Sequence, residues 1–519
     1  MSLTARPIFR FPHRRRQGYF FASFTEAAGR LLFTLALVCS LVAPGAFASP
    51  AGKTTSGLGD VAADAESVGP DAASAPGLGE RLLELWQRKL GTSSPSALRV
   101  TPYGMIVTNA IWNSGAVAPT LDAPIIAKRG SLLDEEMPGQ GSFVLTARQS
   151  RAGLQVGYAW PQGIHADATI EFDLWGLHET EGPGTITQTS LRLRHAFVRI
   201  ADGRFRLLAG QSWSVVTPRL PTSLGHMAVA LHSMSGVIWN RLPQLTLEVE
   251  QPLVGDWFAV FRGSLTRPHS ADGEIGLTRF ETPEPGLMSQ LPWAQGRISL
   301  HSEHVEVGFA GHVGKERFEV AKGTETQPGY RYGELRFDSV DVTTWLASFD
   351  FRFHADAFWL NGQLWTGENV NGMFGLHGVY AERWGQEDLF ANGALAGLRR
   401  DVVPLAATGG WAEAGLHLGQ TGWRALVSGA FETGPREAVG YGALHRNMSA
   451  FGALVYQIFE PLDASIEYLH TFSFYRPNWP EREFPGYRPD QDLLFGGEPP
   501  TRETMGHNGS LSLNFRLRF

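Results

Sequence analysis

The sequence predicts an all-β protein, a 16-stranded antiparallel transmembrane β-barrel preceded by a short N-terminal helix. Three observations predict this class. Residues 510–519 alternate strictly between polar and apolar side chains and end on Phe519. The connections between successive alternating stretches are short and long in turn. Beyond the first fifty residues, no run approaches the about 18 consecutive apolar positions that a membrane-spanning helix requires.

The N-terminus has the pattern of a secretory signal peptide. Arginines occupy 14–16, an apolar stretch covers 31–43, and a small-x-small cleavage site follows at 46–48. We therefore expect residues 1–48 to be removed on secretion. The single cysteine, Cys39, falls inside this segment, so the mature chain has no disulfide framework.

The mature chain is acidic. Residues 1–48 hold six basic residues and one acidic residue, so their removal changes the formal net charge from −7 to −12. This balance argues against nucleic-acid binding. Residues 49–77 are mainly Ala, Gly, Ser, Pro and Asp, and we expect them to form a flexible linker.

A short amphipathic helix is expected at 78–91. Its apolar side chains share one helical face, and Gly91 ends it. The apolar residues of this face are Leu78, Leu82, Leu85, Trp86 and Leu90. About three turns of helix are marginally stable alone. Three roles fit: a coiled-coil handle for a trimer, a plug inside the barrel, or a helix resting against the periplasmic rim, which we slightly favour.

The barrel is expected over 101–519. Its first six strands are predicted near 103–112, 142–158, 164–175, 189–200, 204–213 and 236–250. Later short turns lie near 251–255, 302–303, 354–355, 420–421 and 460–461, and later long loops near 267–292, 315–341, 367–410, 433–445 and 474–506. Counting these connections gives seven short turns, eight long loops and 16 strands. The asymmetry is typical of bacterial outer-membrane barrels, which have short periplasmic turns and long extracellular loops, and not of soluble sandwiches.

Two segments resemble a known family. One is Ala-Arg-Gln-Ser-Arg at 147–151, and the other is Leu-Arg-Leu-Arg-His-Ala at 191–196 with Gly-Gln-Ser-Trp-Ser at 210–214. They resemble the DcaP-like family of trimeric outer-membrane porins. The resemblance implies a homotrimeric channel in the cell outer membrane for small, mostly anionic solutes such as carboxylates, without a cofactor. Where members carry a longer N-terminal coiled coil, this chain has only the short helix.

The expected partners follow from this class. They are outer-membrane lipid around the barrel, small-molecule solutes inside it, and two further copies of the chain. Phe519 resembles the C-terminal aromatic signal that the barrel assembly machinery reads.

Charged residues at alternate positions of the third and fourth predicted strands would face the lumen. The third strand places Asp167, Glu171 and Asp173 there, and the fourth places Arg192 and Arg194 there. These positions predict an acidic ladder beside a basic ladder.

The second predicted strand adds Arg148 and Arg151, which are three positions apart and would point to opposite faces of a regular strand. A charge on the lipid face at mid-membrane costs roughly 2–4 kcal/mol, so we expect a bulge that lets both arginines face inward. By analogy with general porins, the third long loop, 214–235, is expected to fold into the lumen and to carry Arg219 to the constriction.

Two interpretations of these charges have equal weight. In one, the ladders create a transverse field across the constriction, and the guanidinium groups hold carboxylates. In the other, the acidic strand lies between the basic ones, and the ladders pair into salt bridges that hold the barrel wall.

No catalytic constellation or metal site is predicted. His301, Glu303 and His304 are spaced like metal ligands but lie at a predicted tight turn, where their side chains would splay apart. Two rivals to a porin remain. A barrel hydrolase would need a Ser/His or Asp/His set at one rim, and a surface-interaction barrel would act through its long loops, especially 367–410 and 474–506, with a closed lumen.

Overall fold

The structure is a computed structural model that describes residues 98–128, 141–160, 163–176, 189–270, 284–322, 336–383, 399–439, 443–476 and 504–519. The expected signal peptide, linker and helix at 1–48, 49–77 and 78–91 lie outside these residues. Among the described residues, no helix is both long and apolar enough to span a bilayer.

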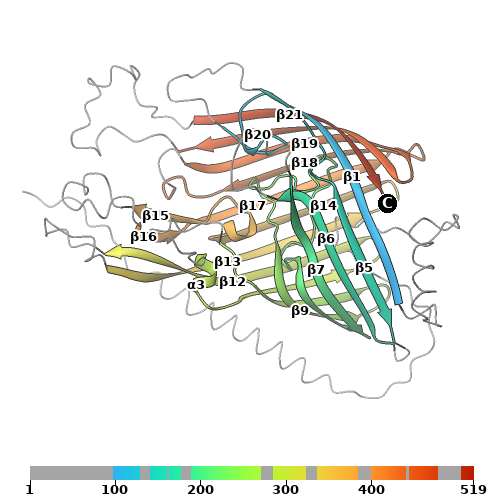
Figure 1. Ribbon diagram of the computed structural model, residues 1–519, viewed down its shortest axis with the longest axis horizontal. Helices are drawn as coiled ribbons and strands as arrows, with labels where there is room; N and C mark the ends of the chain where they lie inside the picture. The colour runs from blue at the N-terminus through green and yellow to red at the C-terminus, as the bar shows by residue number, and fades with distance from the viewer. Residues whose placement is uncertain are drawn as a thin grey trace, which may run out of the picture. The chain divides into compact units, whose positions relative to one another are not determined.

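The strands form one closed antiparallel sheet (Figure 1). They are β1 (Leu98–Asn113), β4 (Ser142–Thr146), β5 (Arg151–Ala159), β6 (His165–Gly176), β7 (Ser190–Asp202), β8 (Phe205–Trp213), β9 (Arg241–Pro252), β10 (Phe258–Thr266), β11 (Trp293–His301), β12 (Val305–Lys322), β13 (Arg336–His354), β14 (Phe358–Glu368), β17 (Ala406–His417), β18 (Trp423–Thr433), β19 (Leu444–Phe459), β20 (Leu462–Tyr475) and β21 (Thr504–Arg518). Because β4 and β5 are the two halves of one strand, the 17 segments make a 16-stranded barrel. The predicted 16-stranded antiparallel barrel is confirmed.

The first and last strands close the barrel. β1 pairs with β21 over nine residues, from Met105 opposite Arg518 to Asn113 opposite Ser510. At the end of the chain, the backbone groups of Gly104 and Phe519 exchange two hydrogen bonds of 3.0 Å. Figure 1 shows β1 in blue running beside the C-terminus. The strand predicted from the alternation at 510–519 is therefore the one that seals the ring.

The predicted bulge in the second strand is present between β4 and β5. Both halves pair with β1, but residues 147–150 leave the ladder. The amide of Ser150 donates to the carbonyl of Ala147 at 3.0 Å, which closes a tight turn. Arg148 and Arg151 are both buried as a result, so neither guanidinium faces lipid.

The connections divide the barrel into two ends. Seven short connections, such as the one between β7 and β8, lie at what we call the turn end. Eight long connections lie at the opposite loop end, as predicted. Some contain elements that the sequence did not predict, namely the hairpins β2 (Val117–Thr120) with β3 (Ala123–Ala127) and β15 (Val379–Arg383) with β16 (Arg399–Pro404), the helix α3 (Pro285–Met288) and the 3₁₀ turn η2 (Asn371–Met373).

The two faces of the barrel wall differ in polarity, as strand alternation requires. On β21, Leu513 and Phe515 point outward and are 41% and 51% exposed. Their neighbours Ser512 and Asn514 point inward and are buried. A polar inner face is what a water-filled lumen needs.

One predicted strand begins later than expected. The sequence pattern predicts a strand from 236 onward that includes Val237, Ile238 and Trp239, but β9 begins at Arg241. These side chains are buried inside the barrel against residues of other strands. Gly236 makes the turn possible, because its φ is 121° and a Cβ there would lie 2.3 Å from the carbonyl oxygen of Phe431.

Candidate functional site

The connection between β8 and β9, residues 214–240, folds into the barrel; we call it the inward loop. Its base is closed by a 2.9 Å hydrogen bond from the Ser214 amide to the Asn240 carbonyl. Most of its residues are buried although they form no strand. Figure 1 shows this coil in green within the ring of strands. The sequence analogy with general porins predicted such a loop.

The loop leaves β8 and crosses to distant strands of the wall. On β11, the amide oxygen of Gln295 accepts a 2.8 Å hydrogen bond from the Ser214 hydroxyl. On β14, the Gln363 amide donates to the Val216 carbonyl at 2.9 Å. Polar inner-face side chains thus satisfy backbone and hydroxyl groups that would otherwise be buried without partners.

The middle of the loop reaches the seam where the barrel closes. The Gln149 side chain, in the bulge between β4 and β5, donates to the Gly225 carbonyl at 2.6 Å and accepts from the Met227 amide at 2.7 Å. Arg151 donates to the Met227 carbonyl at 2.9 Å. The bulge therefore also supplies an anchor for the loop.

The returning part of the loop lies against β14 and β17 to β19. His232 makes 2.7 Å hydrogen bonds with Ser449 of β19 and Ser428 of β18. The Trp365 indole of β14 donates to the Gly236 carbonyl at 2.7 Å. Because its anchors lie on strands around the barrel, the loop narrows the lumen at this level.

Apolar contacts add to these hydrogen bonds. Leu224 and Leu231 of the loop are almost fully buried, and they pack on an apolar part of the inner wall. This patch consists of Leu426, Phe451, Ala453, Val455 and Leu469. Burial of a leucine side chain contributes about 1.5–3 kcal/mol, and the loop shields wall residues that would otherwise contact water in the lumen.

Glu467 of β20 is a further anchor, with three hydrogen bonds to the loop. Its carboxylate accepts from the Ser223 hydroxyl at 2.6 Å, the Leu224 amide at 2.7 Å and the Gly225 amide at 3.1 Å. The side chain is buried and makes no ion pair with the residues that the structure describes. A Cβ at Gly225 would lie 3.0 Å from the carboxylate, so glycine permits this close approach. These hydrogen bonds give both oxygens of the buried carboxyl group a partner in the loop.

Replacing Glu467 by glutamine is expected to loosen the loop. An amide has one acceptor oxygen instead of two, and its NH₂ group would face loop donors. Each lost hydrogen bond costs about 0.5–1.5 kcal/mol. In a planar bilayer, we expect Glu467→Gln to add rapid fluctuations to the open-channel current. The matched control is Glu250→Gln, which alters a partly exposed carboxylate paired with Arg206. Equally quiet currents in Glu467→Gln and the wild type would contradict this role.

Arg219 is the charged side chain of the loop at neutral pH. Burial lowers the pKa of His226 to about 4, and burial, with a smaller effect of His226, lowers that of His232 to about 3. Both imidazoles are therefore neutral at pH 7. Arg219 pairs with Glu306 of β12, so the loop carries one guanidinium to the wall opposite the arginines of β5 and β7.

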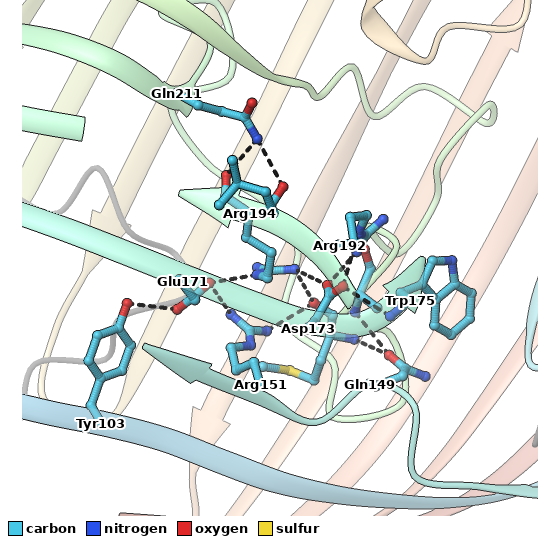
Figure 2. Close-up of polar contacts among 12 residues, drawn as sticks. Tyr103, Gln149, Arg151, Glu171, Asp173, Trp175, Arg192, Arg194 and Gln211 are labelled. Atoms are coloured by element: carbon cyan, nitrogen blue, oxygen red, sulfur yellow. Dashed lines mark hydrogen bonds and ion pairs between the residues drawn. The ribbon is translucent and has the colours of Figure 1, made fainter. Parts of the chain in front are cut away.

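Five of the predicted site residues form one ion-pair network on β5, β6 and β7 (Figure 2). Arg194 is fully buried and donates to Glu171 at 2.6 Å and to Asp173 at 3.0 Å. Arg192 donates to Asp173 at 3.0 Å and 2.5 Å. Arg151 lies 3.8 Å from Glu171. The adjacent ladders thus pair with each other across strands.

The network also holds the inward loop and the first strand. Arg192 donates to the Ala228 carbonyl at 2.7 Å. Tyr103 of β1 donates its hydroxyl hydrogen to Glu171 at 3.0 Å (Figure 2). The Arg192 side chain is 26% exposed, whereas those of Arg194 and Asp173 are fully buried. Arg192 is therefore the guanidinium of this network that presents surface to the lumen.

The remaining predicted residues lie apart from this network. The Arg148 guanidinium donates two hydrogen bonds to the carboxylate of Asp122, which lies between β2 and β3. The same guanidinium lies 3.6 Å from the centroid of the Trp175 ring. Asp167 lies nearer the turn end, where it pairs with Arg199 at 2.8 Å. All eight predicted residues have ion-pair partners, and the structure brings five of them, Arg151, Glu171, Asp173, Arg192 and Arg194, together.

The sequence reasoning missed the uncharged and acidic anchors of the loop. Glu413 of β17 accepts from Thr222 and from the Trp359 indole, at 3.0 Å and 2.8 Å. Gln149, Gln295, Gln363 and Glu467 were also missed. All of them lie in the bulge or at the alternate strand positions that face the lumen. A search for uncharged polar and acidic residues at those positions could have found them.

The structure also places the histidines near residue 301. His301 contacts Ser299 at 2.8 Å and Glu306 at 3.3 Å, while the ring of His304 lies beside that of His354. Within the described ranges, no group of three or more His, Cys, Asp or Glu side chains is arranged to hold a metal ion.

Comparison with known proteins supports the fold. No known sequence family and no curated protein matches the chain. Among solved structures, the outer membrane channel DcaP of Acinetobacter baumannii aligns with a TM-score of 0.55 and 14% identity, covering 82% of this chain and 99% of that one. An anion-selective porin from Comamonas acidovorans (0.45, 10% identity, 81% and 100%) and OmpT of Vibrio cholerae (0.45, 8%, 82% and 99%) align less well. By its fold, the chain is a porin-like 16-stranded barrel that resembles the outer membrane channel DcaP.

Proposed function

We propose that the chain is an outer-membrane porin through which small hydrophilic solutes diffuse passively. The observation that carries this proposal is the inward loop, which is anchored to strands around the inner wall and narrows a barrel whose inner face is polar. A barrel that only displayed surface loops would not need such a loop. Diffusion would be limited by size at the inward loop and by charge along its rim.

The orientation and processing of the chain belong to the same proposal. The turn end faces the periplasm and the long connections face outward, as in bacterial outer-membrane barrels. Residues 1–48 direct secretion, and Phe519 at the barrel seam is recognised by the assembly machinery. The barrel works as a homotrimer surrounded by outer-membrane lipid, and it needs no cofactor and has no catalytic role.

Anionic solutes, including carboxylates, are the proposed preferred cargo. Arg192 of β7 and Arg219 of the inward loop support this preference, because both side chains keep some exposed surface. Around Arg192, the wall and the inward loop are held by buried residues of the same network, namely Arg151, Arg194, Glu171 and Asp173. The charged constriction then combines the two interpretations of the sequence, with paired charges holding the wall and partly exposed arginines facing solute.

Single-channel recording in a planar bilayer tests the proposal. Purified protein under a salt gradient is expected to give stepwise openings, and a trimer would close in three equal steps. The reversal potential is expected to have the sign of anion preference. A folded, heat-modifiable protein that never conducts would contradict the porin and favour a closed barrel acting through its loops. Hydrolysis of detergent-solubilised lipid by the same preparation would favour a barrel hydrolase.

A further inference from the structure

A second charged patch lies on the inner wall of β11, β12 and β13, toward the turn end. It contains three guanidinium groups and two carboxylates. The members are Arg219, Arg297, Arg352, Glu306 and Asp350. Arg219 comes from the inward loop, so the patch lies where the loop meets the wall, away from the network of β5 to β7.

The two carboxylates of this patch are already occupied. Arg297 donates to Asp350 at 2.6 Å and 3.0 Å and to Glu306 at 2.8 Å. The second oxygen of Glu306 pairs with Arg219 and lies 3.3 Å from His301. Both acids therefore have cationic partners that approach them closely.

Arg352 is the third guanidinium of the patch. Its position on β13 is opposite Glu306 of β12 and Asn361 of β14, and it follows the buried Asp350 by two residues, so its side chain is on the lumen face. It is partly exposed and makes no hydrogen bond or ion pair with the residues that the structure describes. Three guanidinium groups against two carboxylates leave one positive charge uncompensated.

Arg219 and Arg352 both lie beside Glu306, because Arg219 pairs with its carboxylate and Arg352 is the residue opposite it on β13. Burial lowers the pKa of Arg219, Glu306 opposes this effect, and the charge of Arg352 adds to the lowering. Two like charges held near each other on a lumen wall are stabilised when an anion lies between them. A guanidinium presents a fork of N–H donors that matches a carboxylate.

We propose that Arg352, together with Arg219, forms a binding site for a small carboxylate on the turn-end side of the inward loop. The site rests on the proposed function, because a solute must reach it through the lumen. It would hold a solute that has passed the loop, or that enters from the turn end, before release.

Malonate block of the single-channel current tests the site. Full-length protein in a planar bilayer is recorded in sodium chloride while malonate is added to one side. We expect saturable block in the wild type and a half-blocking concentration about fivefold higher in Arg352→Ala, because removal of one contact charge in water has an effect of that size. Arg352→Lys is expected to restore part of the block, since it keeps the charge without the fork.

The matched control is Arg317→Ala, which removes an arginine paired with Asp341 on the exposed extensions of β12 and β13. Malonate should block the current of this variant as strongly as that of the wild type. Equal block of Arg352→Ala and the wild type by malonate would overturn the proposed site but not the proposed porin function. An equal loss of block in Arg317→Ala and Arg352→Ala would overturn the site in the same way. No conductance in any protein would instead refute the proposed function. If Arg352→Ala fails to fold, Arg352→Gln provides the same comparison.

Discussion

Replacing residues 215–239 by a two-residue Asn-Gly turn is expected to raise the single-channel conductance severalfold. Ser214 and Asn240 are already hydrogen bonded at 2.9 Å, so a tight hairpin can join them without moving β8 or β9. The excision removes the segment that crosses the lumen. A barrel of 16 strands without such a loop leaves a wide aqueous channel.

The same excision is expected to leave the barrel folded. The ring is held by the strand ladders, and the excision leaves the closure between β1 and β21 unchanged. It does expose the apolar inner patch around Leu426 and Phe451 to water, so some stability should be lost. Heat-modifiable migration on a gel checks the fold of the variant. Unchanged conductance in a folded variant would mean that another segment sets the narrowest point of the channel.

Most of the barrel could be predicted because lipid imposes a strict pattern on each strand. Lipid-facing positions must be apolar and lumen positions tolerate polar groups, so alternation shows both the strands and their faces. The pattern failed at Val237, Ile238 and Trp239. These residues are apolar because the inward loop packs against the inner wall, and sequence periodicity does not distinguish such a segment from a strand.

The site was predicted less completely than the fold. Alternation placed Glu171, Asp173 and Arg194 on the inner face, but it does not show which charges pair. The pairing depends on a register shift between β6 and β7 after Glu171, which brings Arg194 within reach of both acids. Glu467 was missed for a related reason, since its role depends on where a loop more than two hundred residues away in the sequence is anchored.

Replacing Arg194 by alanine is expected to destabilise the folded protein by about 3–5 kcal/mol, the cost of removing one partner from a buried ion pair. The Arg194 side chain is fully buried and contacts both Glu171 and Asp173. Without it, Asp173 keeps Arg192, but Glu171 is left with the Tyr103 hydroxyl and the more distant Arg151. Denaturant unfolding in detergent micelles measures the change. The double variant Arg194→Ala/Glu171→Gln should recover part of the loss, because it also removes the unpaired charge.

Arg199 provides the matched control on the same strand. It pairs with Asp167 at 2.8 Å, but both side chains are about one-third exposed, and a pair in contact with water contributes about 0–1 kcal/mol. Arg199→Ala should therefore unfold close to the wild type. Equal losses in the two variants would show that burial does not determine the strength of these pairs. A stable Arg194→Ala protein with altered ion selectivity would instead assign Arg194 to the conducting surface, and the wall-holding interpretation of the ladders would then be wrong.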